Sequence, residues 1–291
     1  MTNQTTSISI VLPAHDEAES LGTLLPRLYK KFSNAEIIVV DDGSTDETGA
    51  VCTANHAKCI RHPYNMGNGA AIKSGVRNAT GDILVFMDAD GQHDPDDIVR
   101  LLEKLNTGYD MVVGARDTGS QASIGRLFAN KIYNRFATWL SGQKIDDLTS
   151  GLRVARADKF REFLYLLPNG FSYPTTCTMA FLRSGYSVSY VPNRAARRIG
   201  KSHISPLRDG IRFLLIIMRV CTLYAPLKIF FPVSAAIFST GVGYYLYTYM
   251  TTGRFTNMSA LLFLASLSIF LIGLLSEQIT MLLYQKTNIR E

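Results

Sequence analysis

Four clusters of polar residues, each directly after a short apolar run, carry most of the chemistry that this sequence could perform. They are Pro13-Ala-His-Asp-Glu17, Asp41-Asp-Gly-Ser44, Asp88-Ala-Asp-Gly-Gln-His93 and Gly114-Ala-Arg116. Ligands of parallel sheets bind beyond the carboxyl ends of the strands. One polar strand end is ordinary, but four of them predict a shared binding site at one edge of a sheet.

The third cluster offers two carboxylates, Asp88 and Asp90, separated by one residue. Alternate residues of an extended segment point the same way, so both could face one divalent cation. Hard oxygen ligands, with Gln92 and His93 close by, favour Mg²⁺ or Mn²⁺ over zinc. Two acidic residues in a loop are more often solvent-exposed side chains of a turn than metal ligands. It is the position beside three other clusters that favours a metal site here.

The second cluster, with Asp41 and Asp42, closes a predicted strand. Its carboxylates could accept hydrogen bonds from the base or ribose of a nucleoside. Helix capping is an alternative that could hold at the same time, because Ser44 and Glu47 match a capping box. The run Gly67-Asn-Gly69 opens a predicted helix whose first amides could receive an anion such as a diphosphate.

These clusters need elements to position them, and β-branched runs alternate with helical periodicity in this part of the chain. The predicted strands are Ile8–Leu12, Glu36–Val40, Lys58–Ile60, Asp82–Met87 and Asp110–Val113. The predicted helices are Ala18–Phe32, Thr45–His56, Gly69–Ala79 and Pro95–Asn106. This alternation predicts an α/β domain with a mainly parallel sheet covered by helices on both faces.

The last quarter of the chain has a different character. Ile229–Gly253 holds 25 consecutive residues without a charge and Phe255–Ser276 another 22, separated by Arg254 alone. Each run exceeds the roughly 20 residues that cross a bilayer as a helix. We therefore predict a two-helix transmembrane hairpin.

Positive charge is concentrated just before this hairpin. The chain has 30 Lys and Arg against 24 Asp and Glu, and residues 193–219 account for the whole excess of +6. This distribution argues against a nucleic-acid-binding protein and favours one anionic partner, such as a lipid headgroup or a phosphate. The four cysteines form no zinc or disulfide pattern, so we expect reduced thiols.

Residues 204–225 interleave leucine and isoleucine with arginine, which predicts an amphipathic helix in the membrane interface. A helix packed on the soluble domain is the alternative. The amino terminus lacks the basic start and long apolar run of a signal peptide, and basic residues flank both ends of the hairpin. We therefore expect a multi-pass protein of the cell membrane with its first two hundred residues in the cytosol.

Taken together, these motifs resemble a known family. The set Pro13-Ala-His-Asp-Glu17, Val39-Val-Asp-Asp-Gly-Ser-Thr-Asp46, Asp88-Ala-Asp-Gly-Gln-His93, Gly114-Ala-Arg116 and Asp147-Leu-Thr-Ser-Gly-Leu-Arg153 is similar to inverting GT-A glycosyltransferases of family 2. More narrowly, it resembles the polyprenyl-phosphate glycosyltransferases, the group of dolichol-phosphate mannose synthase and bacterial undecaprenyl-phosphate enzymes. The resemblance covers about Ile8 to Ser202, and the hairpin suits the group. It implies a GT-A domain (1–203), a juxtamembrane amphipathic helix (204–225) and transmembrane helices at 226–250 and 256–284.

The resemblance also implies roles for single residues. The expected nucleoside pocket consists of Pro13, His15, Glu17 and Asp42, with Asp41 beside it. The expected metal and diphosphate site consists of Asp88, Asp90 and Gln92, with Mg²⁺ or Mn²⁺ as cofactor. The arginines that match the acceptor region are Arg116, Arg126 and Arg197, which with Asp90 are the candidate catalytic residues. For Arg126 and Arg197, a surface ion pair is the alternative.

The expected reaction moves one sugar from a UDP- or GDP-linked donor to a polyprenyl phosphate and gives a lipid-linked sugar. The acceptor oxygen is already anionic, so no strong general base is needed. The protein must instead supply a metal ion that neutralises the departing nucleoside diphosphate, and arginines that bring two anions together. A direct displacement would invert the anomeric carbon. The sequence does not identify the sugar, the nucleotide or the polyprenol. It also does not fix the oligomeric state, although the hairpins of two copies could pack together through Gly241, Gly243 or Gly273.

Three other functions remain as alternatives. A processive polysaccharide synthase would carry Gln-x-x-Arg-Trp, whereas the only tryptophan, Trp139, follows Ala137-Thr138. A nucleotidyltransferase would need a glycine-rich basic loop after the first strand, where this chain has Pro13-Ala-His-Asp-Glu17. A membrane-held sugar-nucleotide sensor or scaffold without turnover would not require Asp88 and Asp90, and turnover would exclude it.

Overall fold

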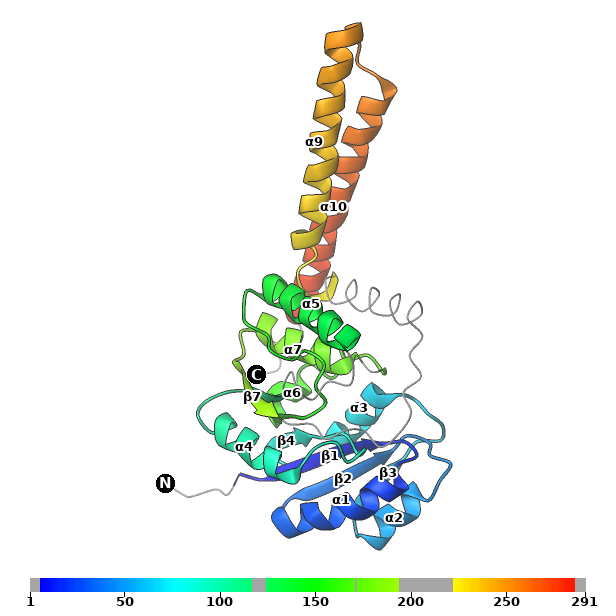
Figure 1. Ribbon diagram of the computed structural model, residues 1–291, viewed down its shortest axis with the longest axis vertical. Helices are drawn as coiled ribbons and strands as arrows, with labels where there is room; N and C mark the ends of the chain where they lie inside the picture. The colour runs from blue at the N-terminus through cyan, green and yellow to red at the C-terminus, as the bar shows by residue number, and fades with distance from the viewer. Residues whose placement is uncertain (1–5, 117–123, 171, 194–221, 286–291) are drawn as a thin grey trace. The chain divides into compact units, whose positions relative to one another are not determined.

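The computed structural model describes residues 6–116, 124–170, 172–193 and 222–285, with side chains for all of these except 124–130 and 285. The chain divides into two compact units, Met1–Ser205 and Pro206–Glu291, each of which is described by itself. Figure 1 traces both units from the amino to the carboxyl terminus.

The first unit contains a seven-stranded sheet in the order β3-β2-β1-β4-β6-β5-β7. The strands are β1 Ile8–Ala14, β2 Glu36–Asp41, β3 Lys58–Arg61, β4 Ile83–Phe86, β5 Met111–Arg116, β6 Arg153–Arg156 and β7 Val188–Asn193. All described pairs are parallel except those of β6, which runs antiparallel to β4 and β5. The prediction of a mainly parallel α/β sheet is therefore confirmed.

Helices cover both faces of this sheet (Figure 1). They are α1 Ala18–Lys31, α2 Thr48–Ala54, α3 Asn68–Asn78 and α4 Pro95–Leu105. Successive side chains of β1 point to opposite faces, so Ile10 and Leu12 join the core with the leucines of α1. On the other face, Val11 touches Gly75 of α3, where a Cβ would collide with the valine. The small residue lets α3 lie close against β1.

The antiparallel strand β6 brings a further loop to the ligand edge. The parallel strands end at this edge, and β6 begins there because it runs the other way. The loop before β6, residues 147–152, therefore lies beside the ends of β4 and β5.

Three helices complete the described part of the first unit: α5 Ile124–Ser141, α6 Ala157–Arg161 and α7 Tyr173–Arg183. Helix α5 buries Tyr133, Ala137 and Leu140, which share one face at helical spacing. Its opposite side leaves Ile132 47% and Trp139 52% exposed.

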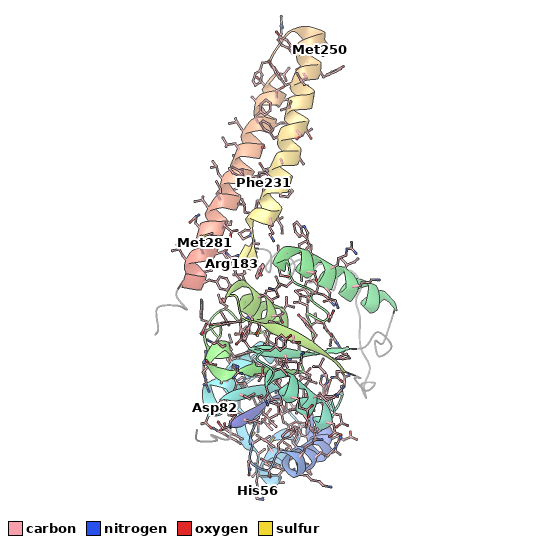
Figure 2. All side chains as sticks on the ribbon, turned by 90° about the vertical axis from the view of Figure 1, so that its left-hand side faces the viewer. His56, Asp82, Arg183, Phe231, Met250 and Met281 are labelled. Atoms are coloured by element: carbon pink, nitrogen blue, oxygen red, sulfur yellow. The ribbon has the colours of Figure 1, made fainter. Side chains whose placement is uncertain are left out.

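The second unit is an antiparallel pair of long helices, α9 Leu227–Thr252 and α10 Asn257–Gln285. Both are long and apolar enough to cross a membrane, with mean hydropathies of 1.4 and 2.4. The Ser234 hydroxyl donates to the Ser266 carbonyl (2.9 Å) and the Ser266 hydroxyl to the Ser234 carbonyl (3.0 Å), which joins the helices inside an apolar interface. Figure 2 shows apolar side chains such as Phe231, Met250 and Met281 projecting outward from this pair. Of the predicted interface helix 204–225, residues 204–221 lie outside the described residues.

Candidate active site

A cavity of about 360 Å³ lies at the carboxyl edge of the sheet. It gathers six of the predicted site residues: Pro13, His15, Glu17, Asp42, Asp88 and Asp90. Pro13 lies at the end of β1, and the other five follow β1, β2 and β4, as parallel topology requires. The loop before β6 adds Thr149 and Gly151, and the start of α7 adds Tyr173 and Pro174. Periodicity in the sequence did not point to these last four residues.

Asp88 and Asp90 are two of the four described carboxylates that line the cavity, with Glu17 and Asp42. Asp88 and Asp90 are both half-buried, and burial raises the pKa of Asp88, as does the nearby Asp90, while His93 opposes the rise. Asp90 Oδ1 accepts the Gln92 amide at 3.1 Å. Among the described residues, no basic side chain forms an ion pair with either carboxylate.

This pair fits a divalent cation that is shared with a ligand. The described residues contain no cluster of three His, Cys, Asp or Glu side chains that could hold a metal ion alone. Mg²⁺ is commonly held by one or two carboxylates together with substrate phosphates. Two carboxylates facing one cavity suit that arrangement.

Gly151 defines the position of the Asp88 carboxylate. A Cβ at residue 151 would collide with both oxygens of Asp88. The backbone of the loop before β6 therefore forms the surface on which this carboxylate rests, and no larger residue fits there without moving it.

Three predicted site residues lie elsewhere. Asp41 is fully buried and outside the cavity lining, with Oδ1 accepting the Ser44 amide at 2.8 Å and Oδ2 3.5 Å from Arg61 Nε. Gln92 meets Asp90 through its backbone, and its side chain does not line the cavity. Of the acceptor arginines, Arg116 is also outside the lining. The side chain of Arg126, on α5, and the whole of Arg197 lie outside the described residues.

Arg116 forms a two-pronged ion pair with Asp147. Its Nε lies 2.8 Å from Asp147 Oδ2, and a terminal nitrogen lies 3.1 Å from Oδ1 and also donates to the Thr149 hydroxyl. Burial opposes ionisation of both groups, yet this pairing dominates: the pKa of Arg116 is raised and that of Asp147 is lowered. Arg116 therefore holds the loop that carries Thr149 and Gly151.

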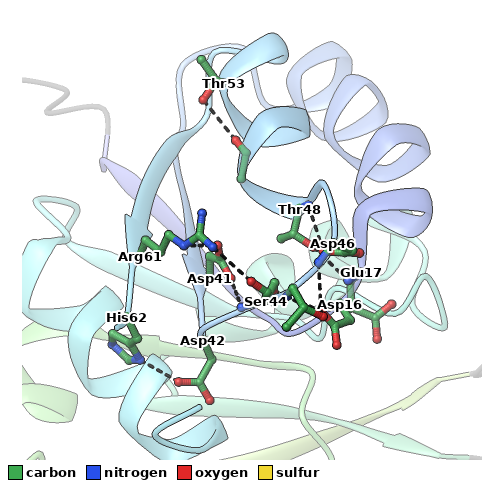
Figure 3. A network of polar contacts seen from close by, with 12 residues as sticks. Asp16, Glu17, Asp41, Asp42, Ser44, Asp46, Thr48, Thr53, Arg61 and His62 are labelled. Atoms are coloured by element: carbon green, nitrogen blue, oxygen red, sulfur yellow. Dashed lines mark hydrogen bonds and ion pairs between the residues drawn. The ribbon is translucent and has the colours of Figure 1, made fainter. Parts of the chain in front are cut away.

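Asp42 lines the cavity but is almost fully buried, and Figure 3 shows its side chain beside that of His62. Its Oδ1 accepts the Met66 amide and Oδ2 the Gly67 amide, each at 2.8 Å. His62 Nδ1 lies 2.7 Å from Oδ1. The carboxylate therefore shapes the loop between β3 and α3, which lines the cavity through Asn65 and Gly67.

The loops after β1 and β2 are joined by Asp16, which was not predicted as a site residue (Figure 3). Asp16 has a φ of 54° and accepts the Thr45 amide at 2.7 Å, which lowers the pKa of its carboxyl group. In the other direction, the amide of Asp16 donates to the Ser44 hydroxyl at 3.0 Å.

The predicted capping box is wrong. Helix α2 starts at Thr48, with Glu47 as its N-cap residue and no side-chain cap bond. Ser44 lies too far before the helix to cap it and instead accepts the amide of Asp16.

The start of α3 lines the cavity through Gly67, Asn68 and Ala71, so the predicted anion site there stays a prediction. The Ala70 amide donates to the carbonyls of Gly67 (2.9 Å) and Asn169 (3.0 Å), so it is already paired within the chain. A Cβ at Gly67 or Gly69 would collide with backbone of residues 168–170. These glycines allow two loops to approach closely, and the Asn169 carbonyl accepts the Ala70 amide.

Arg153 is a fully buried cation behind the cavity wall. Its guanidinium donates to the Pro174 carbonyl at 3.0 Å and also to the Ser150 carbonyl. It therefore joins the loop before β6 to the start of α7, and both segments line the cavity. The motif that Arg153 ends gave no sign that this side chain is buried, because its partner at the start of α7 is distant in the sequence.

Comparison with known proteins agrees with this geometry. Residues 9–164 match the model of glycosyl transferase family 2, and residues 225–282 match the GtrB C-terminal hairpin. A glucosyl-3-phosphoglycerate synthase from Mycobacterium tuberculosis has a similar fold, with a TM-score of 0.60 at 21% identity over 75% of this chain and 79% of that one. The fold is thus that of a GT-A glycosyltransferase. The chain belongs to glycosyl transferase family 2.

Two relatives match over two thirds of this chain or more. An undecaprenyl-phosphate 4-deoxy-4-formamido-L-arabinose transferase from Proteus mirabilis is 32% identical over 80% of this chain and 73% of its own length. A polyprenol monophosphomannose synthase from Mycolicibacterium smegmatis is 29% identical over 67% of this chain and 80% of its own length. The resemblance inferred from the motifs is confirmed.

Proposed function

We propose that this protein transfers a single sugar from a nucleotide sugar to a polyprenyl phosphate at the cytosolic face of a membrane. The observation that carries the proposal is the cavity at the strand ends, where Asp88 and Asp90 meet the nucleoside-side residues His15 and Asp42. The names of the relatives supply the acceptor class, because both act on polyprenyl lipids.

The donor end of the cavity suits a nucleoside diphosphate and a divalent cation. Asp88 and Asp90 would hold Mg²⁺ or Mn²⁺ between them and the diphosphate, and such an ion would neutralise the departing nucleoside diphosphate. In support, a synthase of the same fold is solved with Mn²⁺ and UDP. Asp42 and its loop would form the nucleoside side.

The protein's own residues then have three tasks. The acidic pair would hold the cation that binds the diphosphate, the Arg116–Asp147 pair keeps the loop with Gly151 against Asp88, and the arginines Arg126 and Arg197 would bring the acceptor phosphate to the sugar. The acceptor oxygen is anionic at neutral pH and attacks the anomeric carbon directly. The bond from that carbon to the diphosphate breaks, and the configuration inverts.

The hairpin would anchor the enzyme as a multi-pass membrane protein with its catalytic unit in the cytosol. Aromatic residues gather at the loop end of the hairpin, where Tyr247, Tyr249 and Phe255 are 65%, 57% and 59% exposed. Such residues favour membrane–water interfaces. Helix α5, which carries Arg126, also exposes Ile132 and Trp139, and this apolar surface suits the approach of a lipid acceptor.

Purified protein in detergent tests the proposal. We would incubate it with Mn²⁺ or Mg²⁺, undecaprenyl or dolichyl phosphate and a panel of UDP- and GDP-sugars, and analyse the lipid fraction by mass spectrometry. We expect one glycosylated lipid phosphate with one donor. Hydrolysis of the donor without a lipid product would contradict polyprenyl phosphate as the acceptor. Binding of a nucleotide sugar without any turnover would favour a sensor.

A further inference from the structure

His62 connects the cavity to the helix behind it. Its Nδ1 lies 2.7 Å from Asp42 Oδ1, and its Nε2 lies 2.9 Å from the hydroxyl of Ser74, in the middle of α3. His62 is 7% exposed and Asp42 4% exposed, so this chain of contacts is shielded from solvent. Neither His62 nor Ser74 lines the cavity.

The partners fix the protonation pattern of the imidazole. A carboxylate only accepts hydrogen bonds, so Nδ1 carries a proton and donates it to Asp42. In the neutral ring, Nε2 is then the acceptor of the Ser74 hydroxyl proton. Asp42 therefore selects the tautomer, and Ser74 holds the ring in the orientation that binds Asp42.

Asp42 has little freedom left once these bonds form. Its Oδ1 accepts from His62 and Met66, and its Oδ2 accepts from Gly67. Each carboxylate oxygen can accept two bonds, so one acceptor position on Oδ2 is unused by the described residues. Because Asp42 lines the cavity, that position can serve a ligand only while the carboxylate keeps this rotamer.

We propose that His62, oriented by Ser74, is a positioning residue for the nucleotide: it holds Asp42 and, through Asp42, the cavity loop at Met66 and Gly67. This inference rests on the proposed function, because it assigns the Asp42 side of the cavity to the nucleoside. The imidazole acts through Asp42 and touches no ligand itself.

Two substitutions of similar size separate this role from simple packing. In His62→Asn the side-chain amide lies near the place of Nδ1 and can still donate to Asp42. In His62→Gln it reaches toward the place of Nε2, keeps Ser74 and loses Asp42. Both variants remove the ring, so a role in packing alone predicts similar effects from both.

The measurement is calorimetric binding of UDP and GDP, each with Mn²⁺, to the full-length protein well below its thermal midpoint. We expect His62→Asn to bind within a few-fold of wild type and His62→Gln to bind on the order of tenfold more weakly, the effect of one lost hydrogen bond to a charged group. Equal loss in both variants, or no loss in His62→Gln, would overturn the positioning role.

Ser74→Ala tests the proposal even if the His62 variants fail to fold, because it keeps the imidazole in place. We expect nucleotide binding a few-fold weaker than wild type, because the imidazole loses the hydrogen bond that orients its ring toward Asp42. Unchanged affinity at neutral pH would contradict the proposal. If the wild-type protein binds neither nucleotide, the proposed function itself fails, and this inference fails with it.

Discussion

At the scale of single residues, the position of the Asp88 carboxylate depends on the absence of a side chain at Gly151. A Cβ on this glycine would collide with both carboxylate oxygens, and Arg116 and Arg153 hold its loop from two sides. The acidic pair is thus preorganised by residues that carry no negative charge themselves. Contacts from such neighbouring residues determine how precisely a binding site keeps the geometry of its ligating side chains.

Gly151→Ala tests this contact directly. The new methyl group must displace Asp88, so we expect Mn²⁺-dependent turnover to fall by roughly ten- to a hundredfold. Gly22→Ala in α1 is the control, because a Cβ there meets nothing within 4 Å and should leave turnover unchanged. Normal turnover in Gly151→Ala would show that Asp88 has no fixed role.

Asp90→Ala tests the second carboxylate. We expect turnover to be lost, at least a hundredfold, while membrane insertion and thermal midpoint stay near those of wild type. Asp96→Ala removes a nearby exposed carboxylate that pairs with Lys31 outside the cavity, and it should retain activity. Full activity of Asp90→Ala with either metal ion would count against the metal site.

At the scale of elements, Glu36 joins three strands and the loop before β4. Its Oε2 accepts from the Ser9 hydroxyl (2.6 Å) and the Thr80 amide (2.8 Å), and its Oε1 lies 2.9 Å from Lys58 Nζ. Burial opposes ionisation, but these partners outweigh it and lower the pKa of Glu36 to about 2.

A lowered pKa in the folded state links stability to pH in one direction. The contribution of Glu36 to the free energy of unfolding is complete at pH values above 4.5, the ordinary pKa of its carboxyl group. It is lost as the pH falls through about 2. We expect Glu36→Gln to lower the free energy of unfolding by roughly 1–3 kcal/mol at pH 7, with the difference from wild type shrinking toward pH 2. Denaturant unfolding of both proteins across this range measures it, and a pH-independent difference would contradict the account.

The sequence predicted the parallel half of the sheet well, because its strands are apolar runs separated by clear helix and turn signals. It did not reveal β6, Arg153–Arg156, whose arginines at both ends hide a short buried strand. The first of these, Arg153, is buried and donates to the distant Pro174 carbonyl, and no local pattern reports that contact.

The same limit applies to the site. The residues after β1, β2 and β4 were predictable from strand ends, whereas Thr149, Gly151 and Tyr173 reach the cavity only through the antiparallel return of β6 and the docking of α7. Gly67 and Gly69 matched a phosphate loop in composition, but their role depends on the distant backbone of residues 168–170. Tertiary contacts decided both cases.

At the scale of the whole molecule, the proposed topology can be read by cysteine labelling in sealed right-side-out vesicles. Met250, 85% exposed near the hairpin loop, should react as cysteine with an impermeant maleimide from outside. Native Cys59 is the internal control: it is exposed, and a hydrogen bond with Cys52 lowers its pKa to about 7, so it is reactive. We expect Cys59 to be labelled only after lysis. Labelling of Cys59 but not of position 250 in sealed vesicles would show that the topology is the opposite of the proposed one.

The central claim is transfer of a sugar alone, without its phosphate, onto a lipid phosphate. The most direct measurement is a mass spectrum of the lipid product together with identification of the released nucleotide, for wild type and Asp90→Ala side by side. The account predicts a lipid carrying one phosphate and one sugar, with release of the nucleoside diphosphate, in wild type only. A lipid diphosphate sugar with release of the nucleoside monophosphate, or equal product from Asp90→Ala, would contradict it.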